Sequence, residues 1–93
     1  MQILFTKVVH FTALVKAGGR LREFNLRKLK HADKDVFSVD TVDDRGNRLI
    51  FRLEKNSNDT TWTIVPLEQQ LPAWIGEIEP KLREQIEVEL QQH

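Results

Sequence analysis

Two adjacent glycines, Gly18 and Gly19, separate two runs in which apolar and polar side chains alternate. Glycine readily adopts the positive φ angles of a two-residue turn, so this pair predicts a β-hairpin. A two-residue turn fixes how the flanking strands pair, and here it places Phe11 opposite Leu26. The hairpin therefore has one apolar face and one mostly polar face, as a half-buried antiparallel pair requires.

A second turn is predicted at residues 43–46, where Asp-Asp-Arg-Gly fits a type I turn followed by a left-handed glycine. Pairing Asp43 with Asn47 then sorts the flanking side chains by polarity. One side carries Phe37, Val39, Thr41, Leu49, Phe51 and Leu53. The other side carries Ser38, Asp40, Ile50 and Arg52. Two separate turns thus give the same division into faces.

A fifth strand is expected after the polar loop at 55–59. Its apolar residues Trp62 and Ile64 are predicted to meet Leu53 and Phe51, respectively, in the core. Pro66 ends the strand, because proline has no N–H to give to the ladder. The predicted strands are 3–16, 20–28, 36–42, 48–54 and 60–65.

The remaining residues are predicted to be helical. Proline suits the first position of a helix, so Pro72 and Pro80 indicate a short turn at 72–76 and a main helix at 79–91. One apolar stripe follows the helical period and consists of Ile75, Ile78, Leu82, Ile86 and Leu90. The fold class is therefore α+β. We expect one domain, residues 1–93, with a five-stranded antiparallel β-meander in sequence order, curved or partly closed, and an amphipathic C-terminal helix on one face.

The first residues project past the end of the second strand in this register. Ile3, Leu4 and Phe5 are too apolar to remain in water. They are expected to close a barrel, cover an open end of the core, or add to the sheet edge of a second molecule. We favour the contact with a second molecule.

Positive and negative side chains are unevenly placed, although the net charge is zero. Residues 1–34 hold eight basic and two acidic groups, a net of +6, while residues 60–93 hold two and six, a net of −4. Such asymmetry fits a nucleic-acid surface, and it fits equally a basic hairpin that attracts an acidic helix. The nucleic-acid interpretation uses Arg20, Arg22, Arg27, Lys28 and Lys30.

The polar face of the predicted sheet gathers side chains that could bind an anionic ligand. They are His10, Arg27, Asp40, Arg48 and Arg52. Arginine binds carboxylate and phosphate through paired donors, which supports a ligand site. Cross-strand pairing of Asp40 with Arg48 and Arg52 on a solvated face is the simpler interpretation.

Signatures of catalysis are missing from the sequence. There is no cysteine, no glycine-rich phosphate loop, and neither Ser38 nor Ser57 lies in a nucleophile-elbow context. The stretch 31–35 alternates possible metal ligands with lysine, and a solvated loop explains it better. We expect no enzyme activity, no cofactor and no metal. No signal peptide or membrane-length apolar run is visible, so we expect a small soluble cytoplasmic domain.

The order of elements, consecutive antiparallel strands followed by a helix, resembles that of single-strand nucleic-acid-binding domains of the PUR type. The resemblance lies in topology alone and implies nucleic-acid binding through the basic hairpin. We expect instead a small non-catalytic protein-interaction module that forms a homodimer or binds another protein, with no membrane partner. An unrecognised enzyme or a small-anion binder is the third expectation.

Overall fold

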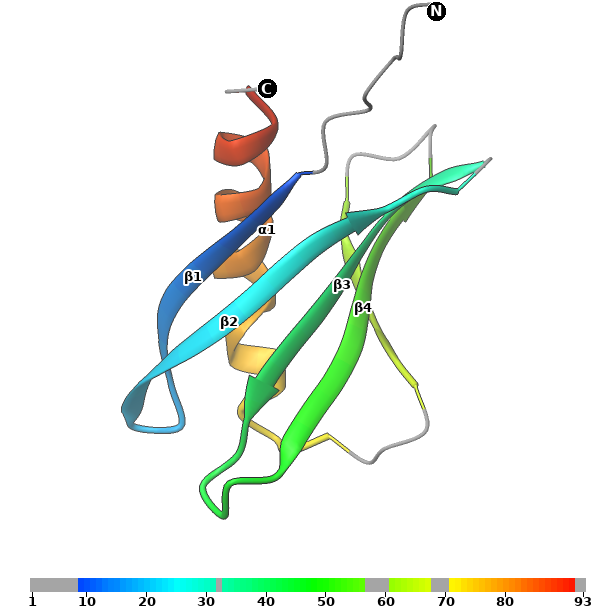
Figure 1. The fold of residues 1–93 in the computed structure, drawn as a ribbon. Coiled ribbons are helices and arrows are strands. Elements are labelled where there is room, and N and C mark those ends of the chain that lie inside the picture. Colours follow the sequence, from blue (N-terminus) through cyan, green and yellow to red (C-terminus); the bar gives the residue numbers. More distant parts are fainter. Residues whose placement is uncertain (1–8, 32, 57–60, 68–70, 92–93) are drawn as a thin grey trace, which may run out of the picture.

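The computed structural model describes residues 9–31, 33–56, 61–67 and 71–91. Five antiparallel strands form one sheet in the order β1-β2-β3-β4-β5, followed by one helix, α1 (Figure 1). The elements are β1 (His10–Ala17), β2 (Arg20–Leu29), β3 (Lys34–Val42), β4 (Arg48–Asn56), β5 (Thr63–Pro66) and α1 (Ile75–Gln91). The predicted meander with a C-terminal helix is confirmed, and the sheet is not closed into a barrel.

Both predicted hairpin registers are confirmed. Phe11 pairs with Leu26 in the first hairpin, and Phe37 pairs with Leu53 in the second pair of strands. Gly18 and Gly19 have φ angles of 59° and 78°, which a residue with a side chain rarely adopts. The chain reversals therefore determine which side chains turn inward, as the sequence indicated.

The register of β5 differs from the prediction by two residues. Ile64 pairs with Leu53, and Pro66 pairs with Phe51. A shift by two keeps every side chain on its predicted face, because side chains alternate along a strand. Trp62 is accordingly buried, and the strand ends at Pro66.

The predicted turn at 72–76 is present, but it runs directly into α1, which begins at Ile75 and corrects the predicted start of the main helix at residue 79. Backbone hydrogen bonds begin already at Pro72, whose carbonyl accepts from the N–H of Ile75 at 3.1 Å. Pro80 lies inside α1 and removes one helical hydrogen bond. Burial of Ile75 and Ile78, both before the proline, offsets that loss by placing the first turns against the sheet.

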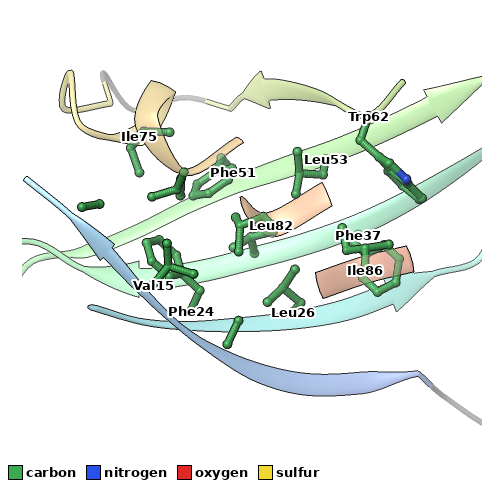
Figure 2. Close-up of a cluster of buried hydrophobic side chains, with 14 of the residues drawn as sticks. Val15, Phe24, Leu26, Phe37, Phe51, Leu53, Trp62, Ile75, Leu82 and Ile86 are labelled. Carbon is green, nitrogen blue, oxygen red and sulfur yellow. The ribbon is translucent and has the colours of Figure 1, made fainter. Parts of the chain in front are cut away.

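The core lies between the sheet and α1. Figure 2 shows Phe24, Leu26, Phe37 and Phe51 from the strands meeting Leu82 and Ile86 from the helix, and all six are fully buried. Ile75 and Ile78 are buried too, and Leu90 packs against the cluster, so the predicted helical stripe is confirmed. Side chains of opposite parity lie on the other side of the sheet, where the candidate ligand site was predicted.

The interaction segment predicted at Ile3, Leu4 and Phe5 lies outside the described residues and stays a prediction. Within the described part of the chain, no helix is both long and apolar enough to cross a membrane.

Candidate binding surfaces

The polar face brings together the residues predicted to hold an anion. Strand pairing places His10 opposite Arg27, Arg27 opposite Ser38, and Ser38 opposite Arg52. These four residues form one row across β1, β2, β3 and β4. Asp40 lies two residues further along β3, and together with Asn25 it lines a hollow with the first three residues of the row.

A chain of hydrogen bonds crosses the sheet beside this row. Thr12 Oγ1 donates to Asn25 Oδ1 at 2.9 Å, and Asn25 Nδ2 donates to Asp40 Oδ1 at 3.0 Å. The second carboxylate oxygen of Asp40 lies 3.5 Å from a guanidinium nitrogen of Arg48. Asp40 is therefore engaged on both oxygens, which confirms the predicted pairing with Arg48, whereas the predicted pairing with Arg52 is not present.

Arg27 and Arg52 differ from Arg48 in this respect. No hydrogen bond or ion pair joins either of them to another residue of the described chain. Arg27 is exposed and Arg52 is half-buried. The row thus holds two arginines that have no partner among the described residues, and they lie on either side of Ser38.

The basic residues proposed for nucleic acid do not form one surface. The strand alternation puts Arg27 on the polar face, whereas Arg20, Arg22 and Lys28 have the opposite parity. Arg20 is paired with Asp44, and Arg22 is buried. Lys30 follows the end of β2 and is exposed. Only some members of the set therefore present a free charge to solvent.

The buried arginine is a structural feature that reasoning from charge alone missed. The Arg22 side chain is only 4% exposed, and its guanidinium carbon lies 3.8 Å from the centre of the Trp74 ring. Its Nε donates to the Ala17 carbonyl at 2.7 Å, and one terminal nitrogen lies 3.0 Å from Asp44 Oδ1. Arg22 thus joins the β1–β2 turn, the β3–β4 turn and the start of α1. Arg22 lies two residues from Phe24 and therefore on the same, core-facing side of β2, and this alternation could have predicted its burial.

Two carboxyl groups in the β3–β4 turn are stabilised in their charged form. The hydrogen bond from Arg22, with the charges of Arg22 and Arg20, lowers the pKa of Asp44 below its ordinary value. The backbone N–H of Asn47 lowers the pKa of Asp43 in the same way. Both groups are surface groups that organise the turn rather than sites with unusual acid–base chemistry.

The free edge of β1 is a second candidate surface. Val9 accepts a hydrogen bond from Lys28 at 2.9 Å, so residues of odd number in β1 bond to β2. The alternation leaves the N–H and C=O groups of His10, Thr12 and Leu14 pointing away from the sheet. At the turn end, the Lys16 carbonyl accepts from Lys81 Nζ of α1 at 3.0 Å. The edge is therefore covered at one end and unpaired along the rest of the described strand.

The opposite edge, β5, is shorter and carries a proline. The bond from Asp43 N to Asn47 O sets the alternation on β4, which directs Thr63 and Val65 toward β4. Ile64 and Pro66 consequently face the free edge, and only Ile64 has an N–H to offer there. Short length and an edge proline are devices that hinder pairing with another strand.

Exposed leucines lie next to the β1 edge on the polar face. Leu14 and Leu21, on β1 and β2, are each 63% exposed. Val42 on β3 is also exposed and lines a second hollow together with Leu21. This end of the polar face is therefore more apolar than the row that contains Arg27.

Comparisons with known proteins give no further guide. No protein-family model, no curated protein and no solved structure matches this chain. Across residues 9–31, 33–56, 61–67 and 71–91, no group of three or more His, Asp or Glu side chains is placed to hold a metal ion. Any functional assignment therefore starts from the two surfaces just described.

Proposed function

We propose that this chain is a small non-catalytic protein-interaction module that self-associates by pairing its β1 edge with β1 of a second copy. The observation that carries the proposal is the set of backbone groups at His10, Thr12 and Leu14, which have no partner within the described part of the chain. Unpaired edge groups are a template for another strand, and proteins usually block them. β1 pairs with β2 without a bulge and contains no proline.

The free groups define one symmetric register. In an antiparallel contact with its two-fold axis at Thr12, Thr12 pairs with Thr12 of the second copy. His10 then pairs with Leu14 of the second copy. By symmetry Leu14 also pairs with His10 of the second copy, and each of the three pairs exchanges two backbone hydrogen bonds, about six in all. The covered carbonyl of Lys16 lies outside this contact. The free part of the edge is thus long enough for a self-complementary pairing.

Side chains in this register are compatible on both faces. On the polar face, the pairs His10–Leu14 and Thr12–Thr12 bring no like charges together. On the core face, Phe11 meets the small Ala13 of the second copy, and Phe11 is half-buried before association. Both α1 helices then lie on the same side of a continuous sheet. We propose that Ile3, Leu4 and Phe5 add apolar contact to this dimer.

Sedimentation equilibrium over a wide concentration range tests the proposal. The expected result is a reversible monomer–dimer equilibrium whose constant changes with substitutions in β1. A strict monomer at millimolar concentration would contradict it. The nucleic-acid alternative has weaker support, because Arg22 is buried and Arg20 is paired with Asp44.

A further inference from the structure

Arg27, Ser38 and Arg52, the part of the row away from the β1 edge, have chemistry that the proposed dimer does not use. Arg27 and Arg52 lie opposite Ser38 on neighbouring strands, so their Cα atoms are separated by two strand spacings, about 10 Å. Arginine side chains are long enough for two guanidinium groups at that separation to converge on one anion. The Ser38 hydroxyl lies between them and adds a donor.

Two acidic groups on this face flank the row, and each is engaged by other side chains. Glu54, two residues from Arg52 on β4, is paired with Lys34. Asp40 accepts from Asn25 at 3.0 Å and lies 3.5 Å from Arg48. Arg27 and Arg52 have no hydrogen bond or ion pair with any residue of the described chain. Two guanidinium charges therefore remain available beside a hollow that His10, Arg27 and Ser38 line.

We propose that this row binds a phosphate monoester, with Arg27 and Arg52 holding the dianionic phosphoryl oxygens and Ser38 donating a third hydrogen bond. Two positive charges match the two negative charges of the monoester, and the planar guanidinium pairs with phosphate oxygens through two donors. The imidazole of His10 lies at the end of the row and offers a further nitrogen donor.

Two features favour a monoester over a nucleic-acid strand. Proteins that bind single strands stack the bases on aromatic side chains. On the described strands, Phe11, Phe24, Phe37 and Phe51 all have core-face parity, and Trp62 is buried, so the polar face has no stacking platform. In addition, two guanidinium groups match the two negative charges of a monoester, whereas a phosphodiester carries only one.

NMR titration of the full chain tests the site, with inorganic phosphate and O-phosphoserine as probes. The expected result is saturable binding that shifts the Ser38 amide and the guanidinium signals of Arg27 and Arg52. Arg27→Gln and Arg52→Gln should each weaken binding about 10-fold, which is the loss of one charged hydrogen-bonding partner. The control is Arg45→Gln, which removes the same charge from the exposed β3–β4 turn and should change affinity less than about 2-fold.

The outcomes separate the alternatives. Shifts that spread over all lysines and arginines, or affinities that Arg27→Gln and Arg52→Gln leave unchanged, would overturn the site. Equal binding of both probes means that the phosphoryl group alone is recognised, whereas tighter binding of O-phosphoserine indicates contacts with the rest of the ligand. A single-stranded oligonucleotide that binds more tightly than either probe, and depends on the same arginines, would overturn the monoester assignment.

Discussion

At one edge of the sheet, β1 directs the N–H and C=O groups of His10, Thr12 and Leu14 toward solvent, whereas Ile64 supplies the one N–H that β5 directs outward at the other edge. β1 has eight residues and no proline, while β5 has four residues and ends at Pro66. Both strands belong to the same sheet and cover the same core. The difference indicates that β5 is protected against pairing and that β1 is left available for it.

The available edge is also the one that the rest of the molecule holds in place. Glu77 of α1 accepts from the N–H of Gly18, and Lys81 donates to the carbonyl of Lys16. Arg22 adds its contacts with Ala17 and Trp74 beneath the same turn. A rigid strand loses less conformational entropy on pairing than a mobile one. The contacts of α1 with β1 thus hold in place the edge on which the proposed dimer depends.

The largest effect is expected from Thr12→Pro, which converts the β1 edge into one like β5. The Thr12 N–H points away from β2, so proline removes the bond at the two-fold axis without breaking the hairpin ladder. Two bonds are lost per dimer and two carbonyl groups lose their donor, which should weaken dimerisation about 100-fold. Sedimentation equilibrium measures the constant. Thr12→Val is the matched control, because it keeps the N–H and should still dimerise.

Arg22→Ala tests whether the β1 side depends on the buried arginine. The substitution removes the cation–π contact with Trp74 and the hydrogen bond to the Ala17 carbonyl, and it leaves a cavity. We expect a loss of about 3 kcal/mol in the free energy of unfolding, measured with urea. Arg20→Ala, which removes only an exposed bridge to Asp44, should cost less than about 0.5 kcal/mol. Equal losses of unfolding free energy in Arg22→Ala and Arg20→Ala would show that the buried contacts of Arg22 do not stabilise the fold.

Lys81→Ala tests the support that α1 gives to the β1 edge. It removes the bond to the Lys16 carbonyl, which lies outside the proposed dimer register. Dimerisation should become about 3-fold weaker, because a more mobile strand loses more conformational entropy on pairing. Tighter dimerisation in this variant would mean that the contact with α1 limits the edge more than it supports it.

The smallest expected effect is a change in how stability depends on pH when Asp44 is replaced. The pKa of Asp44 is lowered in the folded chain, chiefly by the hydrogen bond from Arg22. Its contribution to stability is therefore complete above the ordinary value of 3.8 and is lost as the pH falls through the lower, folded-state pKa. Urea midpoints are measured between pH 7 and pH 2, about the range of this titration. On acidification, the midpoint of Asp44→Asn should fall less than that of the unsubstituted chain. An identical pH dependence of the unsubstituted chain and Asp44→Asn would contradict a stabilising ion pair between Arg22 and Asp44.

The parts of the fold that turn geometry determines could be predicted from the sequence. Gly18 and Gly19 fixed the first hairpin, and the Gly46 turn fixed the pairing of Phe37 with Leu53. The register of β5 could not be predicted, because the loop before it has no such turn. Pro80 was misleading, since a proline at the start of a helix and one inside it look alike in sequence when burial of Ile75 extends the helix.

The candidate site was predictable in part for the same reason. Alternation along known strands placed His10, Arg27 and Arg52 on one face, so the row followed from the registers. Which arginines keep a free charge depends on side-chain geometry, and only the structure shows Asp40 engaged by Asn25 and Arg48. Arg22 was first counted with the surface charges, because its burial requires Trp74, which is distant in sequence.

Cross-linking through single cysteines tests the central claim most directly, because the chain has no cysteine of its own. Thr12 and Thr63 are exposed threonines on the two edges, so Thr12→Cys and Thr63→Cys form a matched pair. Facing residues in a hydrogen-bonded antiparallel pair have Cα atoms about 5.5 Å apart, within disulfide range. We predict that mild oxidation yields a covalent dimer with Thr12→Cys and leaves Thr63→Cys monomeric. Equal cross-linking of both variants, or cross-linking of Thr63→Cys alone, would contradict an edge contact through β1.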